Sequence, residues 1–403
     1  MVRLCRFTTR ARLYEVFLLQ QKIKYPLASC TDMDEVKKGL EGVVVDESRV
    51  CMVDGDEGKI WYAGYDMDDL ARESSYEELL FLLWNDRLPT ADELDEIRTE
   101  VQERRALPEG VAELVDREAD RTGPMDLLRT SVSALASYDD EPNDLDDPAD
   151  KCLGVIAKMP TIIARAHRVR QGKEPAEPRD DLGHAANFLY MLNDEEPSEQ
   201  EASAMDSTFI LYAEHGMNAS TFSACVTAST LANVYSSLTS PVGTLQGPLH
   251  GGATETVIDM LEEVGDASNA ESYVEEKVSN KEKLPGFGHR VYNTVDPRCA
   301  HFKRHIESIN PDAELLAVAD AVRDEVEARL GDKGIWPNTD LYSGTLYREL
   351  GVPAPFYTTL FAASRAAGWS AHIAEQLEDN RIMRPRVKFV GETGREYVPV
   401  DER

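Results

Sequence analysis

The sequence has little positive charge, few cysteines and no long apolar run, and each shortage excludes a class of protein. Its 43 Lys and Arg residues stand against 74 Asp and Glu residues, which gives a net charge of −31. A surface field of that sign disfavours nucleic acid or an anionic membrane as the main partner. No apolar run approaches the roughly 18 residues that a membrane-spanning helix needs. We therefore expect a soluble, cytoplasmic protein that binds no nucleic acid and no membrane.

The six cysteines lack the close spacings that metal and redox sites use. They are spread along the chain as Cys5, Cys30, Cys51, Cys152, Cys225 and Cys299. With 42% hydrophobic residues among 403, the chain can bury a large core and needs no disulfide bonds. We expect free thiols in a reducing cytoplasm, no metal ion and no cofactor.

The acidic excess has two interpretations. At high salt, screening acts over a few ångströms and removes the self-repulsion that a charge of −31 would otherwise cause. An acidic protein from ordinary salt conditions is the alternative. We favour a surface adapted to high salt, as in a halophile.

The N-terminal segment differs from the rest of the chain in charge. Residues 1–31 contain six Lys and Arg residues and a single acid, Glu15. An organellar transit peptide has such a composition, but it fits poorly in front of so acidic a body. We prefer a natural start at Met33, with residues 1–32 as an atypical extension that is not native.

Secondary-structure signals after Met33 are mainly helical. Apolar residues at i, i+3, i+4 and i+7 predict helices over 231–238 and 257–264, and a longer one over 315–330 that stops at Gly331. Ser75 with Glu78 predicts a capping box at the start of another apolar helix.

Two short β-rich stretches stand near the ends of the chain. Residues 43–65 contain two runs around DGDEG, which predicts a hairpin. The run VKFVGETGREYVPV predicts a second hairpin around Gly391 and Gly394. The fold class is therefore mainly α, with small β-hairpins near the ends.

Three of the eight histidines stand in short stretches rich in Gly, Asn or Ser. They are His215 in EHGMNASTF, His250 in GPLHGGATE and His289 in PGFGHRVY. A lone histidine is more often a core or capping residue, but three in similar surroundings favour a site. His250 precedes a helix predicted to start at residue 251 or 252, and the positive end of that helix would keep the imidazole neutral.

The stretch KLPGFGHRVY has neither the period of a helix nor that of a strand. Gly286 and Gly288 would let backbone N–H groups approach a ligand closely. The dinucleotide pattern requires a third glycine where Val291 stands, so the stretch alone is a weak signal for a phosphate loop.

Four further polar residues have both a structural and a functional interpretation. Asp340 precedes a helical run and could be its N-cap. Arg365 interrupts a small, apolar helix, where an arginine needs an anion or a buried carboxylate. From the residues alone, Arg298 and Arg384 are equally well explained as solvated surface arginines.

Six motifs together resemble a known family. EHGMNASTF, GPLHGGA, PGFGHRVYNTVDPR, PNTDLYSG, SRAAGW and RPR occur in the order and at the approximate spacings of citrate synthases. The similarity runs from about Glu41 to the C-terminus and is greatest to the short archaeal and bacterial form. It implies a homodimer with a two-domain helical fold, in which residues 33–250 and 345–403 form a large domain and residues 251–344 a small one.

The resemblance also implies a reaction and a set of site residues. Citrate synthases condense acetyl-CoA with oxaloacetate and water to give citrate and CoA. The implied catalytic residues are His250, His289 and Asp340. The implied substrate-binding residues are His215, Asn218, Arg298, Arg365 and Arg384, the last supplied across the dimer. The implied CoA-binding loop consists of Lys283, Leu284, Pro285, Gly286, Phe287 and Gly288, with Lys283 as a phosphate partner.

Three alternatives stay open at this point. A 2-methylcitrate synthase shares every motif and takes propionyl-CoA, and one methylene is worth only about 1 to 3 kcal/mol in an apolar pocket. A metal-dependent hydrolase could use His215, His250, His289 and Asp340 as ligands, although no HxH or HxxxH pairing is present. A non-catalytic scaffold gives no reason for so complete a set of acids, bases and arginines.

Overall fold

The computed structural model describes residues 36–251 and 254–403. The predicted extension at residues 1–32 lies outside the described residues. No helix in the described part of the chain is long and apolar enough to cross a membrane. The four cysteines within it, Cys51, Cys152, Cys225 and Cys299, are free thiols, as predicted.

A three-stranded antiparallel sheet opens the described chain, in the order β1-β2-β3. Its strands are β1 (Cys51–Asp54), β2 (Lys59–Tyr62) and β3 (Tyr65–Asp66). The predicted hairpin is confirmed: Asp54 pairs with Lys59, and its carboxylate accepts the N–H groups of Asp56 and Glu57 inside the turn. The sequence analysis missed β3.

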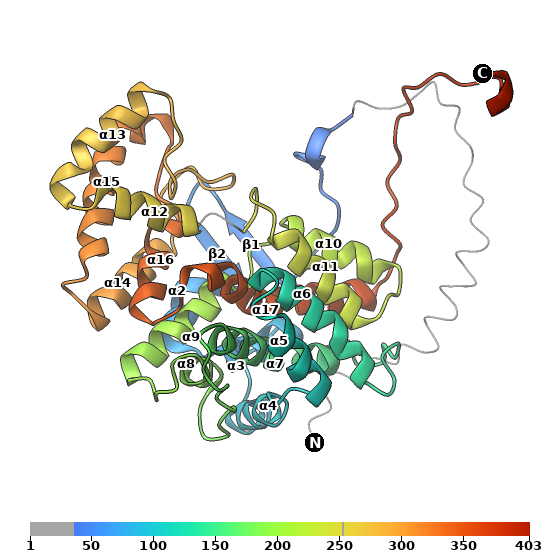
Figure 1. The fold of residues 1–403 in the computed structure, drawn as a ribbon, viewed down its shortest axis with the longest axis horizontal. Helices are drawn as coiled ribbons and strands as arrows, with labels where there is room; N and C mark the ends of the chain where they lie inside the picture. The colour runs from blue at the N-terminus through green and yellow to red at the C-terminus, as the bar shows by residue number, and fades with distance from the viewer. Residues whose placement is uncertain (1–35, 252–253) are drawn as a thin grey trace.

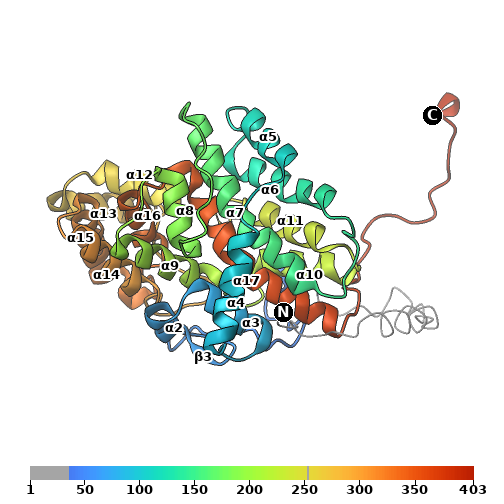
Figure 2. The same ribbon diagram turned by 90° about the horizontal axis from the view of Figure 1, so that it is seen from below.

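Most of the helices form one body around the long helix α17 (Tyr357–Glu378), which runs through its centre (Figures 1 and 2). The others in this body are α2 (Met67–Glu73), α3 (Tyr76–Asn85), α4 (Ala91–Glu103), α5 (Glu109–Glu118), α6 (Pro124–Leu135), α7 (Pro148–Arg170), α8 (His184–Asn193), α9 (Glu199–Ala213), α10 (Ala219–Ser229) and α11 (Val234–Leu245). Helix α17 packs against α7, α9, α10 and α11, so its side chains are buried almost all round.

A second group of helices lies together to one side of this body (Figure 1). It consists of α12 (Thr254–Val264), α13 (Ala270–Ser279), α14 (Cys299–Ile309), α15 (Glu314–Leu330) and α16 (Asp340–Glu349). These helices pack on one another, and α14 also packs on α9 of the larger group. The predicted helices 257–264 and 315–330 are confirmed as α12 and α15, and Gly331 directly follows α15.

Three local predictions need correction. Ser75 caps α3 by accepting the N–H of Glu78, but the Glu78 carboxylate binds the hydroxyl of Ser74, so only half of the capping box forms. Leu231 lies outside α11, in a turn with φ of 62°, because Asn233 caps the helix two residues later.

The predicted C-terminal hairpin is wrong. Residues 384–399 form no strand in the structure, and they extend away from the helical body (Figure 1). Phe389, Val390 and Tyr397 are exposed there. A two-stranded hairpin is marginal in water without a surface to pack against, and residues 384–399 have none among the described residues.

Candidate active site

Six of the predicted site residues lie in loops between helices, at helix ends or on α17. His215 lies between α9 and α10, His250 between α11 and α12, and His289 between α13 and α14. Arg298 immediately precedes α14, Asp340 is the first residue of α16, and Arg365 lies within α17. These are residues up to 150 positions apart in the sequence, counting from 215 to 365.

Two of the histidines are in direct ring contact. The ring centroids of His215 and His289 are 5.3 Å apart, and the ring of Tyr292 packs against both. The Tyr292 hydroxyl is 2.9 Å from Nε2 of His215. Burial, with the positive charges of Arg298 and Arg365, holds the pKa of His215 well below its usual range. His215 is therefore neutral at physiological pH.

The protonated nitrogen of His289 is fixed by its own loop. Its Nδ1 accepts the backbone N–H groups of Val291 (3.1 Å) and Tyr292 (3.3 Å), so the hydrogen of the neutral ring is on Nε2. Protein atoms packed around the ring, and the charge of Arg298, lower its pKa to about 4, although part of the residue reaches solvent. His289 thus presents a neutral N–H donor.

His250 is fixed in the opposite tautomer by the start of α10. Its Nε2 accepts the backbone N–H of Ser220 at 3.2 Å and lies 2.8 Å from the Ser220 hydroxyl. Trp369 of α17 donates its indole N–H to the same hydroxyl. Burial and the charge of Arg365 lower the pKa of His250 to about 4. The ring is therefore neutral and offers Nδ1–H.

This corrects the predicted cause of the neutrality of His250. Helix α12 begins at Thr254, later than predicted, and His250 lies in the turn before it. The helix N-terminus that meets the ring is that of α10, whose N–H group at Ser220 points at Nε2. A positive helix end that donates to a ring nitrogen disfavours imidazolium, so the predicted charge state is retained.

Asp340 is not the N-cap that its sequence context allowed. Thr339 occupies the N-cap position of α16, and the Asp340 carboxylate accepts the hydroxyl of Thr254 from α12 at 2.6 Å. Burial raises the pKa of Asp340, while the bond from Thr254 and the charge of Arg298 partly oppose that shift. A partly desolvated carboxylate of this kind is a stronger base than an exposed one.

Arg298 is buried, which excludes the surface interpretation. Its Nε and Nη2 donate to both carboxylate oxygens of Asp296, at 2.9 and 2.7 Å. The guanidinium also lies 5.7 Å from the ring centroid of Tyr212. The two-point bond to Asp296 fixes the plane of the guanidinium and leaves its Nη1 side for another anion.

Arg365 is buried as well, at 2% exposure. Its Nε donates to the backbone carbonyl of Tyr212 at 2.6 Å, and its guanidinium packs on the ring of Phe361. Burial lowers its pKa, and Glu214 is the carboxylate that most opposes this change. The sequence-based expectation of an anion or buried carboxylate near Arg365 is therefore met by Glu214.

Both glycines of the LPGFG loop have backbone conformations that other residues rarely adopt. Gly286 and Gly288 have φ of 81° and 82°. Gly288 donates its N–H to the carbonyl of Trp336 at 2.8 Å, and Asn338 donates to the carbonyl of Gly286 at 2.9 Å. The loop that carries His289 is thereby joined to the segment that leads into Asp340.

Known proteins resemble this chain both in sequence and in fold. The family model described as "Citrate synthase, C-terminal domain" matches residues 39–386. The chain belongs to the citrate synthase family. The citrate synthase of Haloferax volcanii is 45% identical over 380 residues, which cover 92% of this chain and 99% of that protein. The 2-methylcitrate synthase 1 of Corynebacterium glutamicum is 36% identical, over 92% of this chain and 99% of that protein.

Solved structures of the family have the same fold. The crystal structure of citrate synthase from Pyrobaculum aerophilum has a TM-score of 0.86 at 36% identity, covering 91% of this chain and 95% of that chain. The citrate synthase of Thermoplasma acidophilum, solved as a ternary complex with carboxymethyl coenzyme A and oxaloacetate, has a TM-score of 0.85 at 34% identity, covering 92% of this chain and 100% of that chain. The mainly α citrate synthase fold is therefore confirmed, and the chain is an enzyme of the citrate synthase type.

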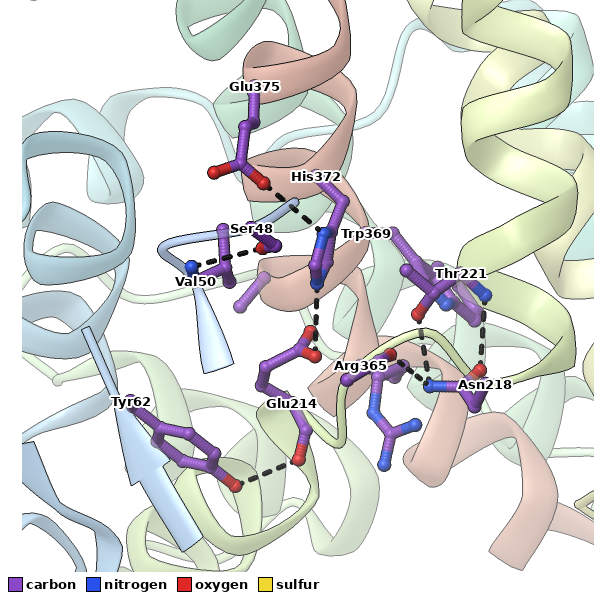
Figure 3. Close-up of polar contacts among 12 residues, drawn as sticks. Ser48, Val50, Tyr62, Glu214, Asn218, Thr221, Arg365, Trp369, His372 and Glu375 are labelled. Atoms are coloured by element: carbon purple, nitrogen blue, oxygen red, sulfur yellow. Dashed lines mark hydrogen bonds and ion pairs between the residues drawn. The ribbon is translucent and has the colours of Figure 1, made fainter. Parts of the chain in front are cut away.

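Three predicted site residues are placed differently from the rest. Arg384 is exposed, in the extended segment after α17, and has no ion-pair partner within the described residues. Lys283 is exposed at the start of its loop. Asn218 caps α10: its Oδ1 accepts the N–H groups of Ser220 and Thr221, and its Nδ2 donates to the Thr221 hydroxyl (Figure 3).

Several residues that contact or influence the predicted site residues were missed from the sequence. They support the predicted residues through the contacts above, and they are Tyr212, Glu214, Ser220, Thr254, Tyr292, Asp296 and Trp369. Asp296 could have been suspected from its place two residues before Arg298, and Glu214 from its place beside His215. The others also lie within five residues of a predicted site residue, but no local pattern shows which atoms they contact.

Proposed function

We propose that this enzyme condenses acetyl-CoA with oxaloacetate and water to give citrate and CoA, with His250, His289 and Asp340 as its catalytic residues. The observation that carries this assignment is the opposite tautomers of the two neutral histidines. Backbone N–H groups occupy Nε2 of His250 and Nδ1 of His289, so each ring presents one hydrogen-bond donor from its other nitrogen.

The first step removes a proton from the methyl group of acetyl-CoA, which is a very weak acid. The Asp340 carboxylate takes this proton, and the Nδ1–H of His250 donates to the thioester oxygen as negative charge develops there. A neutral donor is suited to this task, because its hydrogen bond strengthens as the enol forms.

The second step joins the two substrates. The enol carbon attacks the ketone carbon of oxaloacetate, whose oxygen accepts the Nε2–H of His289, and a new C–C bond forms. Water then cleaves the thioester of the resulting citryl-CoA, which releases citrate and the CoA thiol. The proposed roles of His250 and His289 both require a neutral ring that donates a hydrogen bond.

Oxaloacetate carries two carboxylates, and the proposed site holds buried arginines for them. Arg298 and Arg365 are fixed by Asp296 and by the Tyr212 carbonyl, so little side-chain entropy is lost when the substrate binds. Neutral His215 adds a hydrogen-bonding group at the same place. We assign Asn218 to this site through its place at the start of α10, beside the Ser220 that holds His250.

CoA would follow the loop from Lys283 to Gly288. Gly286 and Gly288 give this loop its shape through their positive φ angles, and exposed Lys283 can meet a phosphate. The loop links to the α16 segment, so closure of a small domain (251–344) over a large one (33–250 and 345–403) would bring CoA and base together. The predicted boundary at residue 344 falls inside α16.

We further propose a homodimer in which Arg384 enters the partner's site. Arg384 lies on an extended segment that leaves its own body and exposes large apolar side chains, among them Val387 and Phe389. An exposed apolar segment of this kind is typical of one that packs against another chain.

The test is oxaloacetate-dependent release of CoA thiol in high KCl, with acetyl-CoA and propionyl-CoA in parallel and a protein-only blank for the cysteines. A strong preference for acetyl-CoA is expected. Equal or faster use of propionyl-CoA would assign the activity to 2-methylcitrate synthesis, the function in the name of the Corynebacterium relative. Release from neither substrate would contradict the proposal.

A further inference from the structure

A row of charged side chains, two of them buried, lies beside the proposed oxaloacetate-binding residues His215 and Arg365, and none of the proposed catalytic steps uses it. It consists of Glu214, His372 and Glu375 (Figure 3). Glu214 and His372 are 0% and 2% exposed at their side chains, and Nε2 of His372 lies 3.1 Å from Oε1 of Glu214. The other ring nitrogen, Nδ1, lies 3.7 Å from the Glu375 carboxylate.

Glu214 and His372 each lie close in the sequence to a proposed substrate-binding residue. Glu214 directly precedes His215 in the loop between α9 and α10, and its backbone carbonyl accepts the hydroxyl of Tyr62 at 3.0 Å. His372 lies on α17 two helical turns after Arg365. The pair therefore joins the loop of His215 to the helix of Arg365.

Two opposing effects set the pKa of His372 in this pair. Burial alone would lower the pKa of His372, but the charge and hydrogen bond of Glu214 outweigh burial, and the pKa is raised. An imidazolium between two carboxylates is then the favoured state, because an unpaired buried carboxylate is costly.

Glu214 also acts on Arg365. Of the charges around Arg365, that of Glu214 most strongly opposes the lowering of the Arg365 pKa by burial. Its Oε2 is buried without a hydrogen-bond partner, and only the absence of a side chain at Gly368 leaves room for it, since a Cβ there would lie 1.9 Å from Oε2. Thus one carboxylate lies between two cations, His372 and Arg365, on the same helix.

We infer that His372 is a positioning residue for oxaloacetate: it holds the Glu214 carboxylate, so that Arg365 remains available to a substrate carboxylate instead of pairing with Glu214. This inference rests on the proposed roles of His215 and Arg365. Without the imidazolium, the negative charge of Glu214 competes with oxaloacetate for Arg365.

The test compares three variants of the full-length enzyme: His372→Gln, Glu214→Gln and the double variant. Glutamine at 372 keeps an N–H donor but removes the charge, so Glu214 is left anionic. We expect His372→Gln to raise the KM for oxaloacetate by about tenfold, with kcat and the KM for acetyl-CoA changed by less than about twofold.

The double variant distinguishes positioning from packing. It has no charge at either position, so the competition for Arg365 disappears and the KM for oxaloacetate returns to within about threefold of the original enzyme. Glu214→Gln alone is expected to stay within the same range. Glu378→Gln, which removes an exposed carboxylate on α17 that binds Arg49, is the matched control and should change neither KM.

Failure of this inference can be distinguished from failure of the proposed function. A double variant as poor as His372→Gln, or a parallel rise in both KM values, would overturn the inference, because it would show general damage to packing. A tenfold effect of Glu214→Gln alone would overturn it as well, and this comparison stands even if His372→Gln does not fold. An inactive original enzyme would instead contradict the proposed function.

Discussion

Thr254 and Asp340 are joined by a hydrogen bond of 2.6 Å between the first turns of α12 and α16. The bond favours the charged carboxylate and so opposes the rise in the pKa of Asp340 that burial causes. Thr254 thereby sets how basic the proposed catalytic base is at a given pH.

Replacing Thr254 by Val should move the acid limb of the pH–kcat profile upward. Without the hydroxyl, the pKa of Asp340 rises further, and the base is deprotonated only at higher pH. A hydrogen bond to a charged group corresponds to a shift of about one pH unit. Thr254→Ser keeps the hydroxyl and should leave the limb in place. An unchanged profile for Thr254→Val would exclude Asp340 as the group that controls it.

Removing the base or the enol donor should abolish most of the turnover without unfolding the protein. Asp340→Asn and His250→Ala are each expected to lower kcat by about 10²- to 10⁴-fold, the range typical of general acid–base catalysis. Thiol release measures the loss, and thermal unfolding checks the fold. Asp332→Asn, at an exposed aspartate in the turn after α15, is the control. Near-normal turnover in either site variant would show that the assigned role is wrong.

The LPGFG loop can be tested with two glycines of similar backbone conformation. Gly288 has φ of 82° and Gly334 has φ of 75°, and neither has a neighbouring atom within 4 Å of an added Cβ. Alanine at either position should cost about 1 to 2 kcal/mol of stability, because a left-handed backbone disfavours a side chain. Only Gly288→Ala should also raise the KM for acetyl-CoA. Equal KM values in the two variants would remove this loop from the CoA site.

The proposed exchange of Arg384 between subunits predicts complementation. Arg384→Ala and His289→Ala should each be nearly inactive as homodimers. After unfolding and refolding together, mixed dimers contain one complete site, so about a quarter of the original activity should return if subunits pair at random. Mixing the folded enzymes without exchange is the control. No recovery in verified mixed dimers would place Arg384 in the site of its own chain.

The charge of −31 predicts a dependence on salt. Screening at molar KCl shortens the range of repulsion to about 3 Å, so both the unfolding temperature and the activity should rise with KCl. Measurements in KCl and in sucrose of matched water activity separate screening from general stabilisation. Activity that is highest in dilute buffer and falls steadily toward molar KCl would contradict the adaptation to high salt.

Local sequence signals predicted the strands and helices that are stabilised by residues close to one another in the sequence. The hairpin at β1 and β2 follows from a turn that its own Asp54 stabilises, and helices α12 and α15 follow from apolar residues that repeat on one face. The C-terminal hairpin failed for the converse reason: its residues have β-type composition, but no part of the chain that the structure describes packs against them.

The sequence by itself determined the family and the reaction class and predicted the site residues, because their motifs are short and each contains its own reactive group. Only the tertiary structure decided how those groups are tuned. The tautomer of His250 depends on the start of α10, the basicity of Asp340 on Thr254 of another helix, and the charge around Arg365 on Glu214 and His372. Burial and long-range hydrogen bonds set pKa values and proton positions, and neither is encoded by spacing along the chain.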